Sequence, residues 1–238
     1  MVQACLNGAR LPAEHPTLPV TADQLAQAAA ATVAEGATAL HVHPKGADGR
    51  DSLLNEHVSQ ALRAVRLAVP GVPLGITTGA WALPDPVARR RIVESWDVRP
   101  DFASVNWHEP GGGEVAEALL TAGVAVEAGL WQRDAVRAFL ASGLAERCLR
   151  VLLEPMEPDA DAAIDSAEEM LTMLGGLAVP VLLHGQDSTA WPVLRVAAER
   201  GLDVRIGLED VLVLPDGAPA PDNAALVAAA REILAGSR

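Results

Sequence analysis

The chain has 238 residues, half of them hydrophobic, and is long enough to bury a substantial core in one large domain. Its formal net charge of −13 argues against nucleic acid as a partner, because binding to phosphates needs clustered lysines and arginines. No apolar run approaches the length of a membrane span, and the N-terminal sequence MVQACLNGAR lacks the features of a signal peptide. We therefore expect no membrane association and a cytoplasmic location.

Short apolar segments alternate with helix-like segments along the whole chain. We expect strands over 2–7, 38–43, 72–78, 101–106, 124–130, 148–155, 179–185 and 203–210, and helices over 21–36, 55–69, 85–96, 113–123, 133–143, 159–175, 188–201 and 222–236. Strands that are apolar throughout and joined to helices by short loops are typical of parallel strands covered by helices. Eight such units favour an α/β fold of the closed (β/α)8 TIM barrel type over an open doubly wound sheet, as a single domain over residues 1–238.

Two negative observations narrow the function. Cys5 and Cys148 both lie in strand-like segments, which indicates buried free thiols and not a disulfide framework. The sequence has no Walker A pattern and no GxGxxG after the first strand, so nucleotide cofactors lose support.

Polar residues gather at the predicted carboxyl ends of the strands, where this fold places its chemistry. They are, in chain order, Asn7 and Arg10, His41 and His43, Thr77, Thr78 and Gly79, Ser104 and Asn106, Glu127, Glu154, His184, and Arg205 with Glu209 and Asp210. The opposite strand ends carry far fewer such groups. We therefore expect an active site at the carboxyl-end face.

Some of these residues have a simpler explanation. Thr77 and Thr78 can equally serve to satisfy backbone groups, and for Glu154, which precedes Pro155, we favour a helix cap. His184 is open to two readings, a buried hydrogen-bonded histidine or a site residue. His15 and His57 are expected on the solvated surface.

The segment ALHVH points to a metal site. Alternation along a strand places His41 and His43 on one face, so two imidazoles aim into the same space. The segment RIGLED places Glu209 on one face with Arg205, and in a closed barrel that face can look across at the histidines. Two imidazoles and one carboxylate form a catalytic zinc set with one position left for water or substrate. A hydrogen-bonded histidine pair without a ligand is the alternative.

These segments resemble the β-keto acid cleavage enzymes, the family that includes 3-keto-5-aminohexanoate cleavage enzyme. The matching pieces, in order, are NGAR at 7–10, LPVT at 18–21, HVH and DGR within 41–50, ITTG at 76–79, ASVN at 103–106, VEAGLW at 126–131, LLHGQD at 182–187 and RIGLED at 205–210. They cover nearly the whole chain.

The resemblance implies a zinc-dependent TIM barrel that cleaves a β-keto acid with acetyl-CoA, giving acetoacetate and an acyl-CoA, which is an acyltransferase reaction. It carries the Zn²⁺ ligands to His41, His43 and Glu209, and the pair that generates the nucleophile to Arg205 and Asp210. It also implies a homo-oligomer, a dimer or tetramer, for which exposed-looking tryptophans such as Trp81 and Trp107 give weak support.

Substrate-binding residues follow from the same motifs. The family's hydroxyl groups near the substrate carboxylate fall on Thr77 and Ser104. The remaining candidates for substrate contact are Thr78, Gly79, Asn106, Glu127 and Arg10.

The chain departs from the family pattern at three places. Arg10 stands where a common family version has an acidic residue, PKGADGR replaces a loop that usually reads like IREDDGR, and His184 stands where glycine is frequent. The identity of the keto acid stays open. So do three alternatives: a zinc-dependent hydrolase, an aldolase on the same barrel, and a metal- or metabolite-binding barrel without catalysis.

Overall fold

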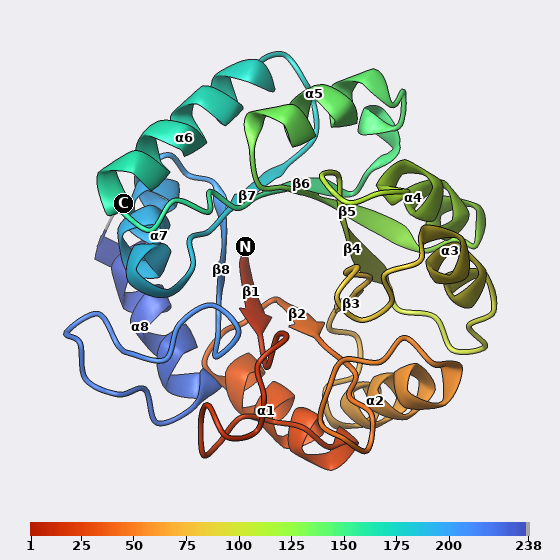
Figure 1. Ribbon diagram of the computed structural model, residues 1–238. Coiled ribbons are helices and arrows are strands. Elements are labelled where there is room, and N and C mark those ends of the chain that lie inside the picture. The colour runs from red at the N-terminus through yellow and green to blue at the C-terminus, as the bar shows by residue number, and fades with distance from the viewer. Residues whose placement is uncertain (237–238) are drawn as a thin grey trace.

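The structure, a computed structural model that describes residues 1–236, is a closed barrel of eight parallel strands in the order β1 to β8, surrounded by eight α-helices (Figure 1). The strands are β1 Val2–Cys5, β2 Ala39–Val42, β3 Leu74–Thr77, β4 Phe102–Asn106, β5 Ala125–Leu130, β6 Arg150–Leu153, β7 Val181–Leu183 and β8 Asp203–Ile206. The helices are α1 Ala22–Ala34, α2 Asn55–Ala68, α3 Pro86–Glu94, α4 Gly112–Thr121, α5 Arg133–Ala141, α6 Ala160–Met173, α7 Ala190–Glu199 and α8 Asn223–Gly236, with short 3₁₀ helices η1 Ala145–Arg147 and η2 Asp187–Thr189. The predicted single-domain (β/α)8 TIM barrel is confirmed.

Local sequence signals explain where several helices begin. Thr21 caps α1 and forms a capping box with Gln24, and Asp85 caps α3 just before Pro86. Helix α6 begins after Asp159, whose side chain accepts a hydrogen bond from the backbone of Ala162. The prediction that Glu154 caps this helix is therefore wrong.

The strands separate two kinds of interior. Outward-facing residues such as Val2, Ala4 and Ile76 pack with the helices in the main apolar core. Inward-facing residues alternate with them along each strand. Gln3 on β1 donates a hydrogen bond to Glu127 on β5, so these side chains meet inside the barrel. The inside of this barrel is consequently polar at many positions where a TIM barrel usually carries branched apolar residues.

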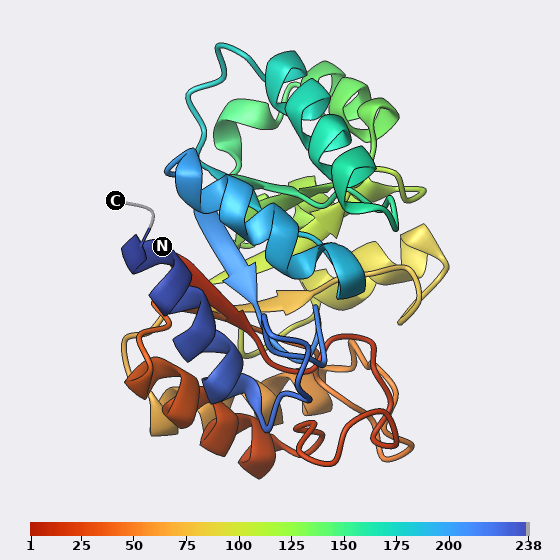
Figure 2. The same ribbon diagram turned by 90° about the vertical axis from the view of Figure 1, so that its left-hand side faces the viewer.

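All strands run in the same direction, so their carboxyl ends open at one face, which Figure 1 views from the front and Figure 2 shows from the side. Long connections lie at this face, among them residues 6–21 after β1 and 207–222 after β8. We call this face the mouth of the barrel.

Two predicted surface residues are buried, and both lie in loops that fold back onto the barrel. His15 contacts the backbone oxygen of Ala220 through Nε2, so it is not a solvated histidine. Trp107 packs edge-on against Phe139 at a ring-centre distance of 5.0 Å and is not an exposed tryptophan. Trp81 is 44% exposed, as expected.

Cys5 and Cys148 are buried free thiols, in agreement with the prediction. Within residues 1–236, none of the helices has both the length and the apolar character needed to cross a membrane.

Candidate metal centre

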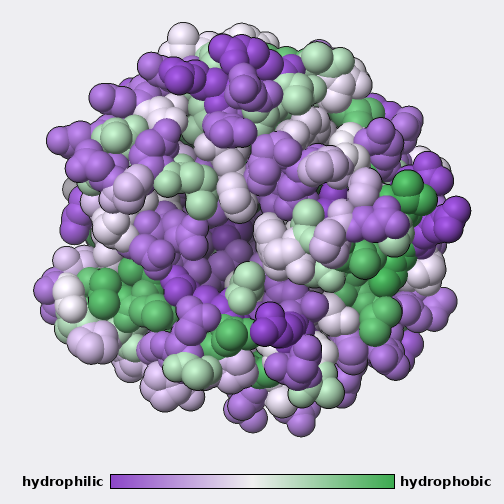
Figure 3. Space-filling model, viewed as in Figure 1, coloured by the Kyte–Doolittle hydropathy of each residue, from purple (hydrophilic) through white to green (hydrophobic). Residues whose placement is uncertain are grey.

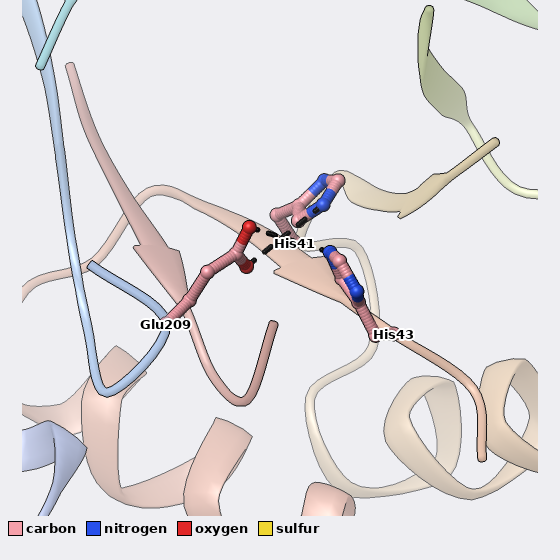
Figure 4. A group of neighbouring side chains, drawn as sticks. All are labelled: His41, His43 and Glu209. Carbon is pink, nitrogen blue, oxygen red and sulfur yellow. Dashed lines mark ion pairs between the residues drawn. The ribbon is translucent and has the colours of Figure 1, made fainter. Parts of the chain in front are cut away.

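Three side chains that could hold a metal ion meet at the mouth. His41 lies on β2, His43 directly follows that strand, and Glu209 lies in the turn after β8 (Figure 4). Each offers one ligand atom, and these atoms lie within 4.8 Å of one another. Nε2 of His43 is 3.3 Å from Glu209 Oε1, and Nε2 of His41 is 4.0 Å from Glu209 Oε2. Glu209 thus reaches the histidines from a turn, and not from the strand itself.

Strand β1 explains how the two segments come together. It pairs with β2 on one side and with β8 on the other, so only β1 separates the ligands. Gly8, just past β1, has a φ of +56°, and a Cβ there would lie 2.4 Å from Cγ of Glu209. Glycine is required at this position both for the left-handed backbone and for the close approach of the glutamate.

His43 is held by a second layer of polar groups. Its Nδ1 lies 2.6 Å from Asp51 Oδ2, and the same oxygen accepts a hydrogen bond from Trp81 Nε1 at 2.7 Å. Lys45 donates to the other oxygen of Asp51 at 2.5 Å. Metal-binding histidines commonly hold a carboxylate in this way, which fixes the ring and leaves the second nitrogen free for the ion.

The two histidines differ in charge. Burial lowers the pKa of His41 to about 3, so this ring is neutral. Although burial opposes it, the carboxylates of Asp51 and Glu209 raise the pKa of His43 to about 9. Burial also opposes ionisation of Glu209, but Arg205 and the two histidines hold its pKa well below the usual range. A metal ion at this site therefore displaces a proton from His43.

The donor set fits a divalent metal ion. Both histidines are almost fully buried, and Oε2 of Glu209 has no hydrogen-bond partner in the described part of the chain. Two imidazole nitrogens and one carboxylate are the protein ligands of one class of catalytic zinc site.

Arg205 and Asp210 adjoin this centre, as predicted. Arg205 donates from Nε to Asp210 Oδ1 at 2.9 Å and from Nη2 to Glu209 Oε1 at 2.5 Å. Burial raises the pKa of Asp210 to about 6, although Arg205 counteracts this effect. Asp210 thus has a pKa near neutral pH and lies beside a candidate metal ligand, which suits a general base.

A cavity of about 310 Å³ opens at the mouth, and Figure 3 shows a hollow lined by hydrophilic residues at the centre of this face. Its lining consists of Ala9, Arg10, Glu14, His43, Trp81, Trp131, Glu154, Gln186, Arg205, Glu209 and Asp210. Trp81 stacks on His43 and on Trp131, with ring-centre distances of 6.0 and 6.5 Å. The cavity thus joins the metal centre and the Arg205–Asp210 pair to an aromatic wall.

The predicted substrate residues on β3 and β4, or just beyond β3, contact the backbone or neighbouring side chains. Thr77 accepts from the backbone of Gly79, and Thr78 donates to the carbonyl of Ser104. Asn106 donates to Glu109. Ser104 is half-buried and pairs in register with Thr77. None of these five residues lines the cavity. Ser104 lies within β4, and the other four lie at or just beyond the end of a strand.

The remaining two candidates are both engaged in ion pairs. Arg10 lines the cavity and bonds to Glu14 and Asp187. Glu127 has no exposed surface and accepts hydrogen bonds from Arg150 at 2.5 Å and from Gln3 at 3.0 Å. Its burial gives no support to a substrate contact.

Sequence reasoning missed Asp51 and Lys45, and it missed the pairing of Glu154 with His184. Asp51 contacts His43, and Lys45 contacts Asp51, through a loop whose path no motif predicts; Lys45 and Asp51 also form an isolated antiparallel bridge. Glu154 lines the cavity, and its carboxylate lies 3.4 Å from Nε2 of His184. The position of Glu154 and His184 at strand ends indicated a site at this face, but no sequence feature predicted that the two side chains lie together.

The fold and this site define a TIM barrel with a candidate metal centre of two histidines and one glutamate at its mouth. Residues 1–237 match the family model described as beta-keto acid cleavage enzyme, and the chain belongs to this family. Members of this family act on small-molecule β-keto acids.

Solved structures of low sequence identity share the fold. 3-Dehydroquinate dehydratase from Geobacillus kaustophilus HTA426 is 13% identical with a TM-score of 0.62, and the match covers 98% of this chain and 89% of that one. The N-acetylmannosamine-6-phosphate 2-epimerase from Clostridium perfringens is 11% identical with a TM-score of 0.59, over 88% and 87% of the two chains. The mandelate racemase/muconate lactonizing enzyme from Roseiflexus sp. is 14% identical with a TM-score of 0.55. That match covers 87% of this chain but spans only 55% of the longer enzyme.

Proposed function

We propose that this protein is a zinc-dependent acyltransferase that cleaves a β-keto acid with acetyl-CoA, giving acetoacetate and a new acyl-CoA. The observation that carries the proposal is the meeting of His41, His43 and Glu209 beside the Arg205–Asp210 pair, at a cavity that all of these residues except His41 line. Membership of the family supports the β-keto acid as the substrate class. Use of acetyl-CoA, the zinc ion, a homo-oligomeric state and a cytoplasmic location remain predictions.

His41, His43 and Glu209 would hold the ion, which would polarise the keto oxygen of the substrate as a Lewis acid when bound. Asp210 takes a proton from the substrate as the reaction begins. Arg205 holds the carboxylate of Asp210 in place for this step. The guanidinium of Arg205 also places positive charge where negative charge develops on the substrate.

Substrate recognition has several sources on the chain. Arg10 is suited to a carboxylate if the substrate displaces Glu14 or Asp187 from its guanidinium. Of the two predicted hydroxyl donors, Ser104 is half-buried and Thr77 is buried, so Ser104 is the more accessible. Trp81 and Trp131 form an aromatic wall of the cavity against which an apolar part of the substrate can pack.

Metal analysis followed by a screen of β-keto acids tests the proposal. We expect about one zinc per chain, and formation of acetoacetate and an acyl-CoA only when acetyl-CoA and a β-keto acid are both present. Replacing His41 or His43 by Ala should remove most of the metal and leave the barrel folded. The same metal content in both variants as in an unrelated protein would show that the site is wrong.

The same screen separates the alternatives. A zinc-dependent hydrolase would consume its substrate without acetyl-CoA and release the free acid. An aldolase would release an aldehyde or ketone. A binding protein without catalysis would retain zinc and give no product with any member of the screen.

A further inference from the structure

His184 lies between two carboxylates at the mouth and has no role in the proposed reaction so far. It directly follows β7 and is 1% exposed. Its Nδ1 lies 3.4 Å from Asp210 Oδ1, and its Nε2 lies 3.4 Å from Glu154 Oε2. The imidazole therefore connects the Arg205–Asp210 pair to a carboxylate on the cavity wall.

The two oxygens of Asp210 have different surroundings. Arg205 Nε donates to Oδ1 at 2.9 Å, and His184 Nδ1 approaches the same oxygen. Oδ2 is buried and has no hydrogen-bond partner within residues 1–236. Holding one oxygen from two sides fixes the carboxylate plane and leaves the other oxygen as the free acceptor.

The segment that carries His184 also holds the backbone of Asp210. The backbone N–H of Asp187 donates to the carbonyl of Asp210 at 2.7 Å. Asp187 is the one non-glycine residue with a positive φ in the described part of the chain, at 49°. A strained backbone persists where the surrounding structure fixes it, and this occurs often at functional sites.

Glu154 completes the arrangement. It is buried, it lines the cavity, and Asp159 and not Glu154 caps the following helix. Its carboxylate faces Nε2 of His184, while the acceptors near Nδ1 are Asp210 Oδ1 and the carbonyl of Gly185 at 3.2 Å. Nδ1 thus faces oxygen atoms that accept hydrogen bonds, whereas Nε2 has no hydrogen-bond partner within residues 1–236 and lies 3.4 Å from the carboxylate of Glu154.

We propose that His184 is a positioning residue for Asp210: it donates from Nδ1 to Oδ1, with Glu154 orienting the ring from the other side, so that Oδ2 stays free to take the substrate proton. This inference rests on the proposed function, in which Asp210 is the base. The contacts of 3.4 Å are long for N–H···O hydrogen bonds, and such contacts often tighten when substrate binds.

Two variants of similar size separate this role from a merely structural one. The amide nitrogen of an asparagine at this position lies near the place of Nδ1, so His184→Asn keeps a donor toward Asp210. The amide of the longer His184→Gln lies near the place of Nε2, so this variant keeps a donor toward Glu154 only. We expect His184→Gln to lower kcat by about 10- to 100-fold with little change in KM, and His184→Asn to keep most of the turnover.

The probe is acetoacetate, the smallest keto acid of the proposed class, and the readout is enzyme-catalysed exchange of its α-protons in D₂O, followed by NMR on the zinc-loaded protein. Glu154→Gln provides a second variant that removes the charge facing Nε2, and we expect it to slow exchange less than His184→Gln does. His57→Asn and His57→Gln, on the outer helix α2, are matched controls that should leave exchange unchanged. Metal content and melting temperature are measured for every variant.

Each outcome has one meaning. Equal losses in the Asn and Gln variants, or losses that follow the melting temperature, would overturn the positioning role while leaving the proposed function intact. Wild-type protein that binds zinc but exchanges no protons would overturn the proposed function, and this inference with it. If neither His184 variant folds, normal exchange in Glu154→Gln overturns the role assigned to the pair, and slowed exchange supports it.

Discussion

The barrel interior holds two arginine–carboxylate pairs that look alike in composition and differ in their surroundings. Toward the N-terminal ends of the strands, Arg150 donates to Glu127 and lies over the ring of Phe102 at 4.7 Å, closed off from solvent. At the mouth, Arg205 donates to Asp210 beside an open cavity. The first pair is packed like a structural element, and the second is placed like a catalytic one.

The pKa values of the two carboxyl groups, Glu127 and Asp210, shift in opposite directions. Burial favours the neutral acid in both cases, but Arg150 outweighs it at Glu127 and lowers that pKa. At Asp210 burial prevails and raises the pKa to about 6. The difference arises because Asp210 shares its arginine with a second carboxylate: Arg205 also donates to Glu209. Glu127, by contrast, accepts hydrogen bonds from both Arg150 and Gln3. One arginine that serves two carboxylates leaves one of them able to exchange a proton near neutral pH.

The largest expected effect is at Asp210. Asp210→Asn keeps the shape and a hydrogen-bond acceptor for Arg205 but removes the basic group, so turnover should fall by about 100- to 10,000-fold. The variant should fold and keep its metal. Steady-state rates and metal analysis measure this, with the exposed Asp161→Asn on α6 as the control.

Near-normal turnover in Asp210→Asn would remove Asp210 from the role of base. A variant that fails to fold would instead make the Arg205–Asp210 pair structural, like its counterpart at the other end of the barrel.

The second prediction concerns stability. Glu127→Gln leaves the buried Arg150 without a counter-ion, and removing one partner of a buried ion pair typically costs about 3–5 kcal/mol of unfolding free energy. Denaturant unfolding measures the loss. The double variant Glu127→Gln/Arg150→Met should be more stable than Glu127→Gln alone, because it also removes the unpaired charge.

The contrast between the pairs would break if Glu127→Gln were as stable as the wild type and lost turnover. That result would return Glu127 to the substrate-contact role predicted from its motif.

How far the sequence alone leads can be seen at the same two ends of the barrel. The eight strands were predictable because a parallel strand covered by helices is apolar nearly throughout, and short loops separate it from each helix. His41 and His43 were predictable because they lie two residues apart on one strand. Glu209 was predicted on a strand face and lies in a turn, so only its neighbourhood was correct.

Contacts between distant segments were not predictable. Asp51 reaches His43, and Glu154 meets His184, only because of the loop paths and the closure of the barrel. Arg150 with Glu127 depends on the register between β5 and β6, which places the two residues side by side. The predictions for His15 and Trp107 were wrong because we assumed that loop residues face solvent, whereas these two loops pack against the core.

A third carboxylate, Asp51, extends the comparison because it is ion-paired and also contacts a proposed metal ligand, His43. It bridges Lys45 and His43 at the mouth. Asp51→Asn weakens the hydrogen bond that orients the His43 ring and lowers the pKa of His43. We therefore expect the affinity for zinc to be about 10- to 100-fold weaker. Competition with a chelator measures the affinity, with the exposed Asp48→Asn of the same loop as the control. Equal affinities in the two variants would show that Asp51 serves only the loop.

The smallest effect is a pH dependence that separates the two pairs in one experiment. Asp210 must be ionised to take a proton, and its pKa is about 6, so the rate should fall about tenfold per pH unit below that value. A bound divalent ion nearby favours the ionised form, so the midpoint should lie at pH 6 or below.

The fold should persist through the same range of pH. The pKa of Glu127 is lowered from its ordinary value of 4.5, so its stabilising contribution is present above pH 4.5 and is lost only as the pH falls through the lower value in the folded state. The raised pKa of Asp210 acts in the opposite sense, because its protonation below pH 6 favours the folded state. Between about pH 6 and pH 4.5 we therefore expect an enzyme that loses rate reversibly while it keeps its structure.

Initial rates, far-UV circular dichroism and metal content are measured at each pH, and the residual rate of Asp210→Asn should not show the acid limb. A rate that falls together with the metal content would assign the acid limb to protonation of the histidine ligands. A rate that falls together with the circular dichroism signal would assign it to unfolding, and the two pairs would then no longer be distinguished by function.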